Sequence, residues 1–177
     1  MTRLFVAIGG NIEPQQRLPR AAQELRRRFP GVRFSSCYRN PAYGFAGADF
    51  YNAVAEAETA LSLSAVQAQL QEVEALCGRA RSDAKWAPRA MDLDLLLFGD
   101  LIHKTERFEL PRPDLLRRAY MLAPLAELAP QLRHPLTART MSEHWHELAA
   151  QPHELAKLAL DLNSPDGAAA AGRSLPP

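Results

Sequence analysis

The sequence predicts an α+β domain built around one sheet, and three observations support this prediction. Short apolar runs typical of buried strands alternate with stretches in which apolar residues recur every three or four positions, as on one side of a helix. Their order is strand, helix, strand, strand, helix, strand, and further helical stretches follow. This order is typical of the ferredoxin-like βαββαβ fold. We therefore expect an αβα sandwich, with helices on both faces of the sheet and additional helices near the carboxyl end.

The first half of the chain contains three of the expected strands. Residues 3–9 form an apolar run that ends at two glycines, which indicates a strand buried on both faces. Apolar residues then recur at helical spacing until Pro30 and Gly31, which stop a helix. The elements expected here are a strand over 3–9, a helix over 14–29, a strand over 32–39, a loop rich in turn residues over 40–49 and a strand over 50–58.

The second half continues the alternation and ends in a different composition. The elements expected here are a helix over 62–77, a charged loop over 79–89, a strand over 91–98, and helices over 113–127 and 142–161. Residues 163–177 contain four consecutive alanines with Ser, Gly and Pro, and offer almost nothing to bury. The sequence therefore predicts a single domain over 1–162 and a disordered tail over 163–177.

Composition and charge exclude several classes of protein. The 177 residues are 47% apolar and 23% charged, which is usual for a globular chain. The formal net charge of +1 argues against broad nucleic-acid binding, which needs a basic face. No apolar run approaches the roughly 20 residues of a membrane span, and the amino-terminal run is too short for a signal peptide. Cys37 and Cys77 have neither disulfide-framework nor zinc spacing, so we expect free thiols and a cytoplasmic protein.

Two carboxylates, Asp92 and Asp94, stand two residues apart in the expected strand over 91–98. Side chains two apart in a strand point to the same face, and a carboxylate pair among apolar neighbours is costly unless it is compensated. Carboxylate oxygens suit Mg²⁺, which completes its coordination with water and phosphate oxygens. The alternative is an exposed pair on an edge strand.

The loop before this strand is strongly cationic. It contains Arg79, Arg81, Lys85 and Arg89 within eleven residues. Arginine offers a planar donor fork that matches phosphate, and lysine acts as a point charge. The alternative is a solvated basic loop, but Trp86 argues against it because a tryptophan needs a packing partner. The basic loop and the pair of aspartates together suggest a site for a metal-bound polyphosphate.

Two further segments offer binding groups. Phe50, Asn52 and Val54 share a strand face, where an aromatic ring and an amide are suited to stack on a planar heterocycle and bind its polar edge. The alternative is a core aromatic beside an asparagine at a strand end. A later segment adds cationic donors and another aromatic, namely Arg112, Arg117, Arg118 and Tyr120. The alternative there is an ordinary helix entry with surface arginines.

Taken in this order, the segments resemble the 6-hydroxymethyl-7,8-dihydropterin pyrophosphokinase family of folate biosynthesis. The resemblance runs from the first strand to about residue 135. Its most specific part is Arg79-x-Arg81 followed by Lys85-Trp86-Ala87-Pro88-Arg89-x-x-Asp92-Leu93-Asp94. In the family this block is close to R-x-R and then (K/R)-W-G-P-R-x-x-D-L-D. Other positions that match are Tyr38-Arg39-Asn40-Pro41, Asn52-Ala53, Glu74 and Leu97-Phe98-Gly99.

The resemblance implies an enzyme that transfers pyrophosphate from ATP to the hydroxymethyl group of the pterin and releases AMP. It implies two Mg²⁺ ions held by Asp92 and Asp94. The catalytic residues it implies are Arg79, Arg89, Asp92 and Asp94. The ATP-binding residues it implies are Glu74, Arg79, Arg81, Lys85, Trp86, Arg89, Arg107, Arg112 and Arg118. The pterin-binding residues it implies are Asn40, Pro41, Tyr43, Phe50, Asn52, Trp86, Asp92 and Tyr120. We expect a monomer whose partners are ATP and a pterin, with no nucleic acid and no membrane.

The chain departs from the family pattern at several positions. Gly10 stands where serine is usual, Ala87 where glycine is usual, and Arg112 where histidine is usual. Phe50 replaces a common tyrosine and Tyr120 a common phenylalanine. These departures leave a second hypothesis, a diverged paralogue that binds pterin or nucleotide with an altered substrate or little turnover. A third, an RNA-binding ferredoxin-like module, is disfavoured by the near-neutral charge and the aspartate pair.

Overall fold

One six-stranded sheet organises the fold. The computed structural model describes residues 1–42, 46–78 and 90–164. Its elements are β1 (Thr2–Gly10), α1 (Pro14–Arg28), β2 (Arg33–Phe34), β3 (Tyr38–Asn40), β4 (Phe50–Thr59), α2 (Leu63–Leu76), β5 (Asp92–Phe98), β6 (His103–Lys104), β7 (Glu109–Leu110), α3 (Ala119–Leu128), α4 (Met141–Ala149) and β8 (Ala156–Lys157). Strands β6 and β7 form a separate two-stranded hairpin.

The strand order confirms the predicted ferredoxin-like plan. The order is β5-β1-β4-β3-β8, with β2 also paired to β4, and every pair is antiparallel. The first split βαβ unit is β1, α1 and the β2–β3 segment, and the second is β4, α2 and β5. Strand β1 therefore lies between β4 and β5, and the last strand of each unit lies at the outer side of the other unit's first strand.

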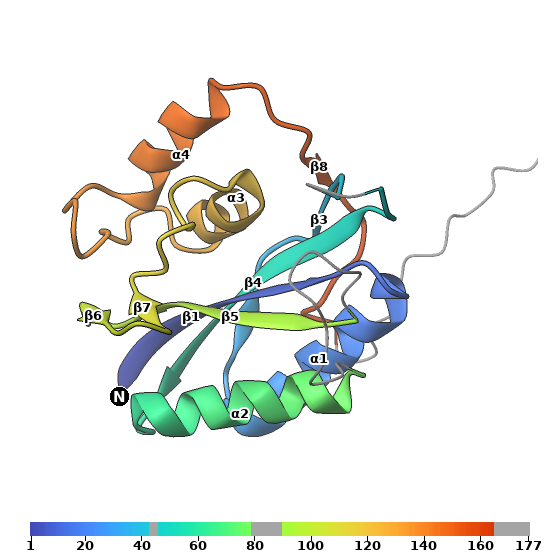
Figure 1. The fold of residues 1–177 in the computed structure, drawn as a ribbon, viewed down its shortest axis with the longest axis horizontal. Coiled ribbons are helices and arrows are strands. Elements are labelled where there is room, and N and C mark those ends of the chain that lie inside the picture. The colour runs from blue at the N-terminus through green and yellow to red at the C-terminus, as the bar shows by residue number, and fades with distance from the viewer. Residues whose placement is uncertain (43–45, 79–89, 165–177) are drawn as a thin grey trace, which may run out of the picture.

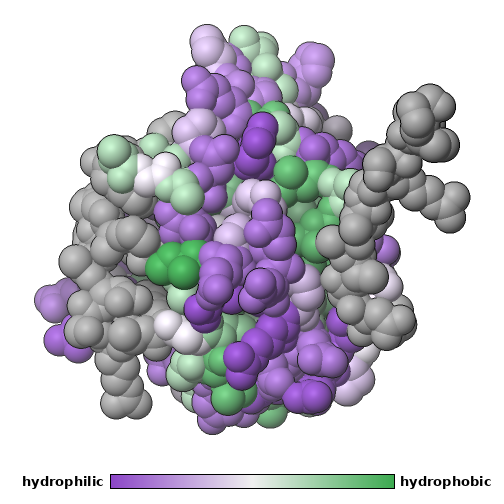
Figure 2. All heavy atoms as spheres, turned by 90° about the vertical axis from the view of Figure 1, so that its right-hand side faces the viewer, coloured by the Kyte–Doolittle hydropathy of each residue, from purple (hydrophilic) through white to green (hydrophobic). Residues whose placement is uncertain are grey.

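Helices cover both faces of the sheet, as predicted. Helices α1 and α2 lie on one face, α3 lies on the other, and α4 packs against α3 (Figure 1). A large apolar cluster fills the space between the sheet and α1 and α2, and a second fills the space under α3 and α4. Alternating residues of β1 supply the two clusters, which is the consequence of the two-residue period of a strand. The face shown in Figure 2 is mostly hydrophilic, with apolar side chains in small separate patches.

The expected strand over 32–39 is instead two short strands, so this prediction was wrong. Strands β2 and β3 are separated at Ser35. The Ser35 backbone N–H donates to the Val54 carbonyl at 2.9 Å, and the Ser35 hydroxyl accepts from the Val54 N–H at 2.9 Å. A side-chain oxygen therefore takes the place of a backbone carbonyl beside β4, and the regular ladder is interrupted.

Both predicted C-terminal helices have different bounds in the structure. The helix expected over 113–127 begins only at Ala119, because residues 113–117 form turns in which the Arg117 and Arg118 N–H groups bond the Asp114 carbonyl. The helix expected over 142–161 ends at Ala149. Pro152 follows closely, and proline both lacks an N–H donor and disfavours helix in the residue before it.

The chain beyond α4 returns to the sheet. Strand β8 pairs with β3, and the Leu158 N–H donates to the Cys37 carbonyl at 2.8 Å. The Asn163 side chain accepts from the Phe34 N–H and donates to the Phe34 carbonyl, both at 2.9 Å, so this residue of the expected tail is attached to β2. Residues 165–177, the rest of that tail, lie outside the described residues. In the described ranges, no helix combines the length and the apolar character that crossing a membrane requires.

Candidate active site

The aspartates of β5 lie on the face of the sheet that α3 partly covers. Leu93 and Leu95 point into the cluster under α1 and α2, whereas Leu96 belongs to the cluster under α3. Asp92 and Asp94 alternate with the two leucines, so they share the opposite face, as predicted, and both are half-buried. The end of this face near the start of β5 is therefore acidic, and Leu96 farther along the strand is apolar.

A row of residues across three strands joins Asp92 to Asn52. Gly9 of β1 is the register partner of Asp92 on one side and of Asn52 on the other. Neighbouring strands lie about 4.8 Å apart, so the backbones of Asn52 and Asp92 are separated by roughly 10 Å. A Cβ on Gly9 would lie only 2.6 Å from the Asn52 Oδ1. The glycine thus leaves room for the Asn52 amide to lie over β1.

Asn52 is one of two buried amides at the β3–β4 end of this row. The Asn52 Nδ2 donates to the Asn40 Oδ1 at 2.5 Å, and the Asn40 Nδ2 donates to the Pro41 carbonyl at 2.8 Å. Phe50 is the register partner of Asn40. Four of the residues predicted to bind a pterin are therefore brought together, and two adjacent amides offer both donors and acceptors.

Arg112 lies against the second aspartate. Its Nη1 is 3.0 Å from the Asp94 Oδ1, and both side chains are partly exposed, by 33% and 24%. Its backbone N–H donates to the Leu96 carbonyl at 2.9 Å, which holds the segment before α3 against β5. Tyr120, in the first turn of α3, lies close enough for both charges to act on it. Burial raises the pKa of the Tyr120 hydroxyl, Arg118 and Arg112 act to lower it, and Asp94 acts to raise it.

Glu74 reaches the same strand from the other layer. It lies near the end of α2, is 9% exposed, and its Oε1 accepts from the Leu93 N–H at 2.7 Å. Leu93 stands between the two aspartates, so Glu74 helps to set the backbone from which both carboxylates project. The sequence suggested ATP binding for Glu74 and did not suggest this contact, because helical periodicity carries no information about a partner nineteen residues away.

Sequence comparison places this geometry in a known family. The profile of the 7,8-dihydro-6-hydroxymethylpterin-pyrophosphokinase (HPPK) family matches residues 5–130. The chain belongs to the HPPK family. The similar curated proteins include the 2-amino-4-hydroxy-6-hydroxymethyldihydropteridine pyrophosphokinase of Pseudomonas aeruginosa, 38% identical over 75% of this chain and 84% of that protein. The enzyme of the same name from Methylorubrum extorquens is 35% identical over 75% of this chain and 85% of that protein.

Comparison with solved structures shows the same fold. A crystal structure of the Plasmodium falciparum HPPK-DHPS triple mutant with STZ-DHP matches with a TM-score of 0.68 and 12% sequence identity. The match covers 84% of this chain and 43% of that chain, so this HPPK protein spans less than half of the larger Plasmodium chain. At this identity the likeness supports the fold alone.

Of the remaining predicted site residues in the described ranges, Arg118 lies near Tyr120, where its charge acts to lower the pKa of the tyrosine hydroxyl, and Arg107 lies on the β6–β7 hairpin. Arg118 is exposed at the start of α3, and Arg107 is exposed in the turn of the β6–β7 hairpin. That hairpin lies at the end of β5 remote from Asp92 (Figure 1). The predicted residues that lie outside the described part of the chain are Tyr43, Arg79, Arg81, Lys85, Trp86 and Arg89.

The donor atoms present fit a magnesium site completed by substrate. Among the residues that the structure describes, no group of three or more His, Cys, Asp and Glu side chains is arranged to hold a metal. Asp92 and Asp94 offer two hard carboxylates on one face. Mg²⁺ commonly takes one or two protein carboxylates and fills its other positions with water and phosphate oxygens. The pair thus suits a metal that arrives with a polyphosphate.

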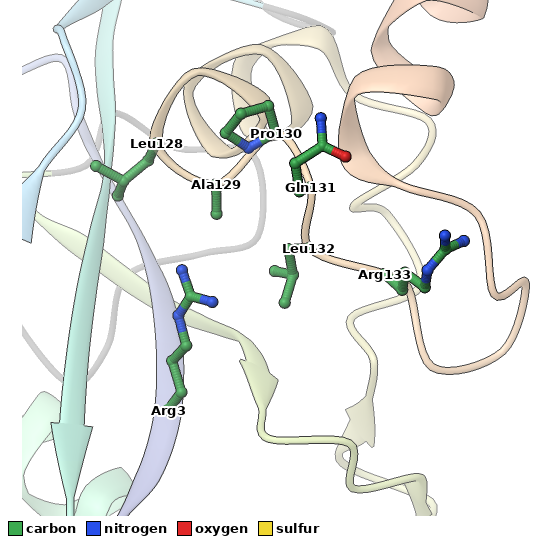
Figure 3. Close-up of a pocket in the computed structure, with 7 residues that line it drawn as sticks. All are labelled: Arg3, Leu128, Ala129, Pro130, Gln131, Leu132 and Arg133. Atoms are coloured by element: carbon green, nitrogen blue, oxygen red, sulfur yellow. The ribbon is translucent and has the colours of Figure 1, made fainter.

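A separate hollow of about 430 Å³ lies at the opposite end of the sheet. It is bounded by Arg3 of β1 and by residues 128–133, from the last residue of α3 onward (Figure 3). Arg3 pairs with Glu56 at 2.6 Å, and the Arg133 Nη1 donates to the Ala138 carbonyl at 2.7 Å. Strand β1 runs from Thr2 to Gly10, so the hollow and the Gly9 row lie at its two ends. The hollow is not part of the candidate active site.

Proposed function

We propose that this HPPK protein transfers the pyrophosphoryl group of ATP to the hydroxymethyl group of 6-hydroxymethyl-7,8-dihydropterin, a step of folate biosynthesis. The hydroxyl oxygen attacks the β-phosphorus, the bond from that phosphorus to the oxygen bridging the α-phosphorus breaks, and AMP leaves with that oxygen. The hydroxyl proton is released to solvent. The observation that supports this most is the Asn52–Gly9–Asp92 row, which sets a buried amide and a carboxylate on one face of one sheet.

The pterin end of the proposed site is the β3–β4 side. Asn40 and Asn52 present amide donors and acceptors, as the polar edge of a pterin requires. Phe50 and Tyr120 are the aromatic side chains we assign to stacking on the planar ring. Pro41, Tyr43 and Trp86 complete the proposed set.

The phosphate end is the β5 side. We assign Asp92 and Asp94 to two magnesium ions, which, when bound with ATP, would offset the phosphate charge and lower the pKa of the attacking hydroxyl. Glu74 acts here by holding the Leu93 backbone. The cationic groups we assign to the triphosphate are Arg79, Arg81, Lys85, Arg89, Arg112 and Arg118. Arg107, farther along, is assigned to the nucleoside end of ATP. Phosphoryl-type transfer needs positioning and charge rather than covalent participation by protein, and such a set supplies both.

We further propose a monomeric cytoplasmic enzyme without nucleic-acid or membrane partners. The net charge of +1 supports the absence of a nucleic-acid partner, and the apolar side chains on the face shown in Figure 2 form only small separate patches. The thiols of Cys37 and Cys77 are free and buried, which suits a reducing compartment.

The experiment that tests this function measures AMP formation from ATP and Mg²⁺ with and without the hydroxymethyl-dihydropterin. We expect AMP and pterin diphosphate in equal amounts, dependent on the pterin and abolished by EDTA. AMP formation equal to the no-pterin control at saturating substrates would rule the function out. Stabilisation against heat by the pterin or by α,β-methylene-ATP without turnover would instead support the diverged paralogue.

A further inference from the structure

The ion pair between Arg112 and Asp94 places a fixed cation on one of the two proposed metal carboxylates. The Nη1–Oδ1 distance of 3.0 Å is that of a close ion pair at a partly exposed site. A magnesium–oxygen bond is about 2.1 Å long, so an ion on this carboxylate would lie beside the guanidinium. Two cations at that separation repel each other strongly at a partly buried site. Arg112 and a metal ion therefore compete for Asp94.

The backbone of Arg112 is held by hydrogen bonds of its own, separate from the ion pair of its side chain. The Arg112 N–H donates to the Leu96 carbonyl at 2.9 Å, and the Leu115 N–H donates to the Arg112 carbonyl at 3.1 Å. Pro111 and Pro113 flank it and restrict its backbone further. The side chain is 33% exposed in all, although its Nε atom is buried and has no hydrogen-bond partner. Among the described residues, the ion pair with Asp94 is the polar contact of this guanidinium, so the side chain can leave Asp94 while the backbone hydrogen bonds stay in place.

The charge balance on this face changes when a metal-bound nucleotide arrives. Without a metal, Asp92 and Asp94 are like charges two residues apart, and Arg112 offsets part of their repulsion. With MgATP, the incoming ion offsets the carboxylates and the phosphates offer a better partner for a guanidinium fork. The same arginine is then suited to bind phosphate. A neutral histidine, usual at this position in the family, would offset less.

We infer that Arg112 is a tethered counter-ion that competes with the metal for Asp94 and moves to the phosphates when the nucleotide binds. The chain consequently binds a divalent ion weakly by itself and takes it up together with ATP. This inference rests on the metal role proposed above for Asp94. It makes Arg112 a residue that sets the order in which metal and nucleotide bind.

The test uses Mn²⁺ as the probe, without nucleotide, and measures free Mn²⁺ by electron paramagnetic resonance. We expect Arg112→Met to bind Mn²⁺ roughly tenfold more tightly than the wild type, because the competing charge is gone. Arg112→Lys should stay close to the wild type. The matched control is Arg139→Met. Arg139 lies away from the site, where its Nη1 is 2.8 Å from the Glu147 Oε2, so its removal should leave Mn²⁺ affinity unchanged. Asp94→Asn added to Arg112→Met should abolish the gain.

A second readout follows the other half of the inference. With Mg²⁺ saturating, Arg112→Met should bind α,β-methylene-ATP more weakly than the wild type, since a phosphate donor is lost. Circular dichroism and thermal melting confirm that each variant is folded. Mn²⁺ affinity in folded Arg112→Met equal to or below that of the wild type would overturn the inference. If pterin-dependent AMP formation by the wild type persists in that case, the proposed function stands and only the role of Arg112 fails.

Discussion

The two faces of the sheet differ although the same strands form both. Toward α1 and α2, β5 contributes Leu93 and Leu95 to a large apolar cluster, with the Glu74 carboxylate buried at its edge against β5. Toward α3, Leu96 is packed as tightly, but the row at Asp92 and Asn52 is polar. Helix α3 covers only part of this face, so the strand ends beyond it carry residues that packing does not require.

The residues that stabilise the fold and the residues proposed for the reaction therefore lie on different faces of the same strand. Burial of leucine stabilises the fold, whereas a half-buried carboxylate pair costs stability and is retained for another reason. Substitutions on the two faces of the same strand should therefore have opposite signatures. Substitutions of the buried leucines should lower the free energy of unfolding, and substitutions of the aspartates should lower the rate of turnover.

The largest expected effect is that of Asp92→Asn. The change preserves shape and removes the charge that would hold the metal, so the rate of AMP formation should fall by about a thousandfold or more. Thermal melting should shift by no more than a few degrees. Steady-state kinetics and calorimetry measure the two quantities. A variant that keeps near wild-type turnover would contradict the metal assignment.

Leu95→Ala, on the opposite face of the same strand, should give the reverse result. Leu95 is 3% exposed, and removing a buried leucine costs about 2–5 kcal/mol of unfolding free energy. Urea denaturation measures that loss. At a temperature where the variant is folded, its turnover should stay within about twofold of the wild type. A large loss of turnover in fully folded Leu95→Ala would show that the two faces are not separable.

Gly9→Ala should affect the pterin end alone. The new Cβ would lie 2.6 Å from the Asn52 Oδ1 and must displace that amide. The KM for the pterin should rise by roughly tenfold while the KM for ATP stays unchanged. The control is Asn52→Ala, in which adding Gly9→Ala should change little further, since the clashing group is gone. Additive losses in the double variant would contradict this account.

The smallest expected effect is a change of stability with pH that depends on His134, which lies between α3 and α4. His134 is 4% exposed, and burial, with the nearby His144, lowers its pKa below the ordinary value. The folded state therefore favours the neutral ring. Stability should be complete above about pH 6.5 and fall as the pH drops toward the folded pKa, because the unfolded chain takes up the proton first.

The measurement is the unfolding free energy of the wild type and His134→Gln between pH 5 and 8. The wild type should lose less than about 1 kcal/mol more than the variant across this window, as expected for a modest pKa shift. Equal pH slopes in both proteins would contradict the assignment to His134.

Local pattern was enough to predict the central elements. The two-residue alternation of β5 predicted that Asp92 and Asp94 share a face, and the helix expected over 62–77 matches α2 within one residue at each end. The same periodicity predicted a continuous strand through Ser35, where a side-chain hydrogen bond interrupts the ladder. It also predicted a helix beyond Ala149, where Pro152 follows closely. Those determinants act against an otherwise continuous periodicity.

The contacts that complete the site were beyond sequence reasoning. The Arg112–Asp94 pair joins residues eighteen apart, and the Glu74–Leu93 bond joins two different layers. Both depend on how segments pack in three dimensions. Residue type marked Arg112 as a cationic donor and the family resemblance implied ATP binding, but neither revealed its ion pair with Asp94.

The central claim is that the residues at the Asp92 and Asn52 end of the sheet serve the transfer of a pyrophosphoryl group from ATP to the pterin. The most direct measurement uses ATP labelled with ³²P at the β-phosphorus, with the hydroxymethyl-dihydropterin and Mg²⁺. We predict that the label appears on the pterin with the wild type and not with Asp92→Asn. Label that stays with the adenine nucleotide while the pterin is phosphorylated would show transfer of a single γ-phosphate, and would contradict the account.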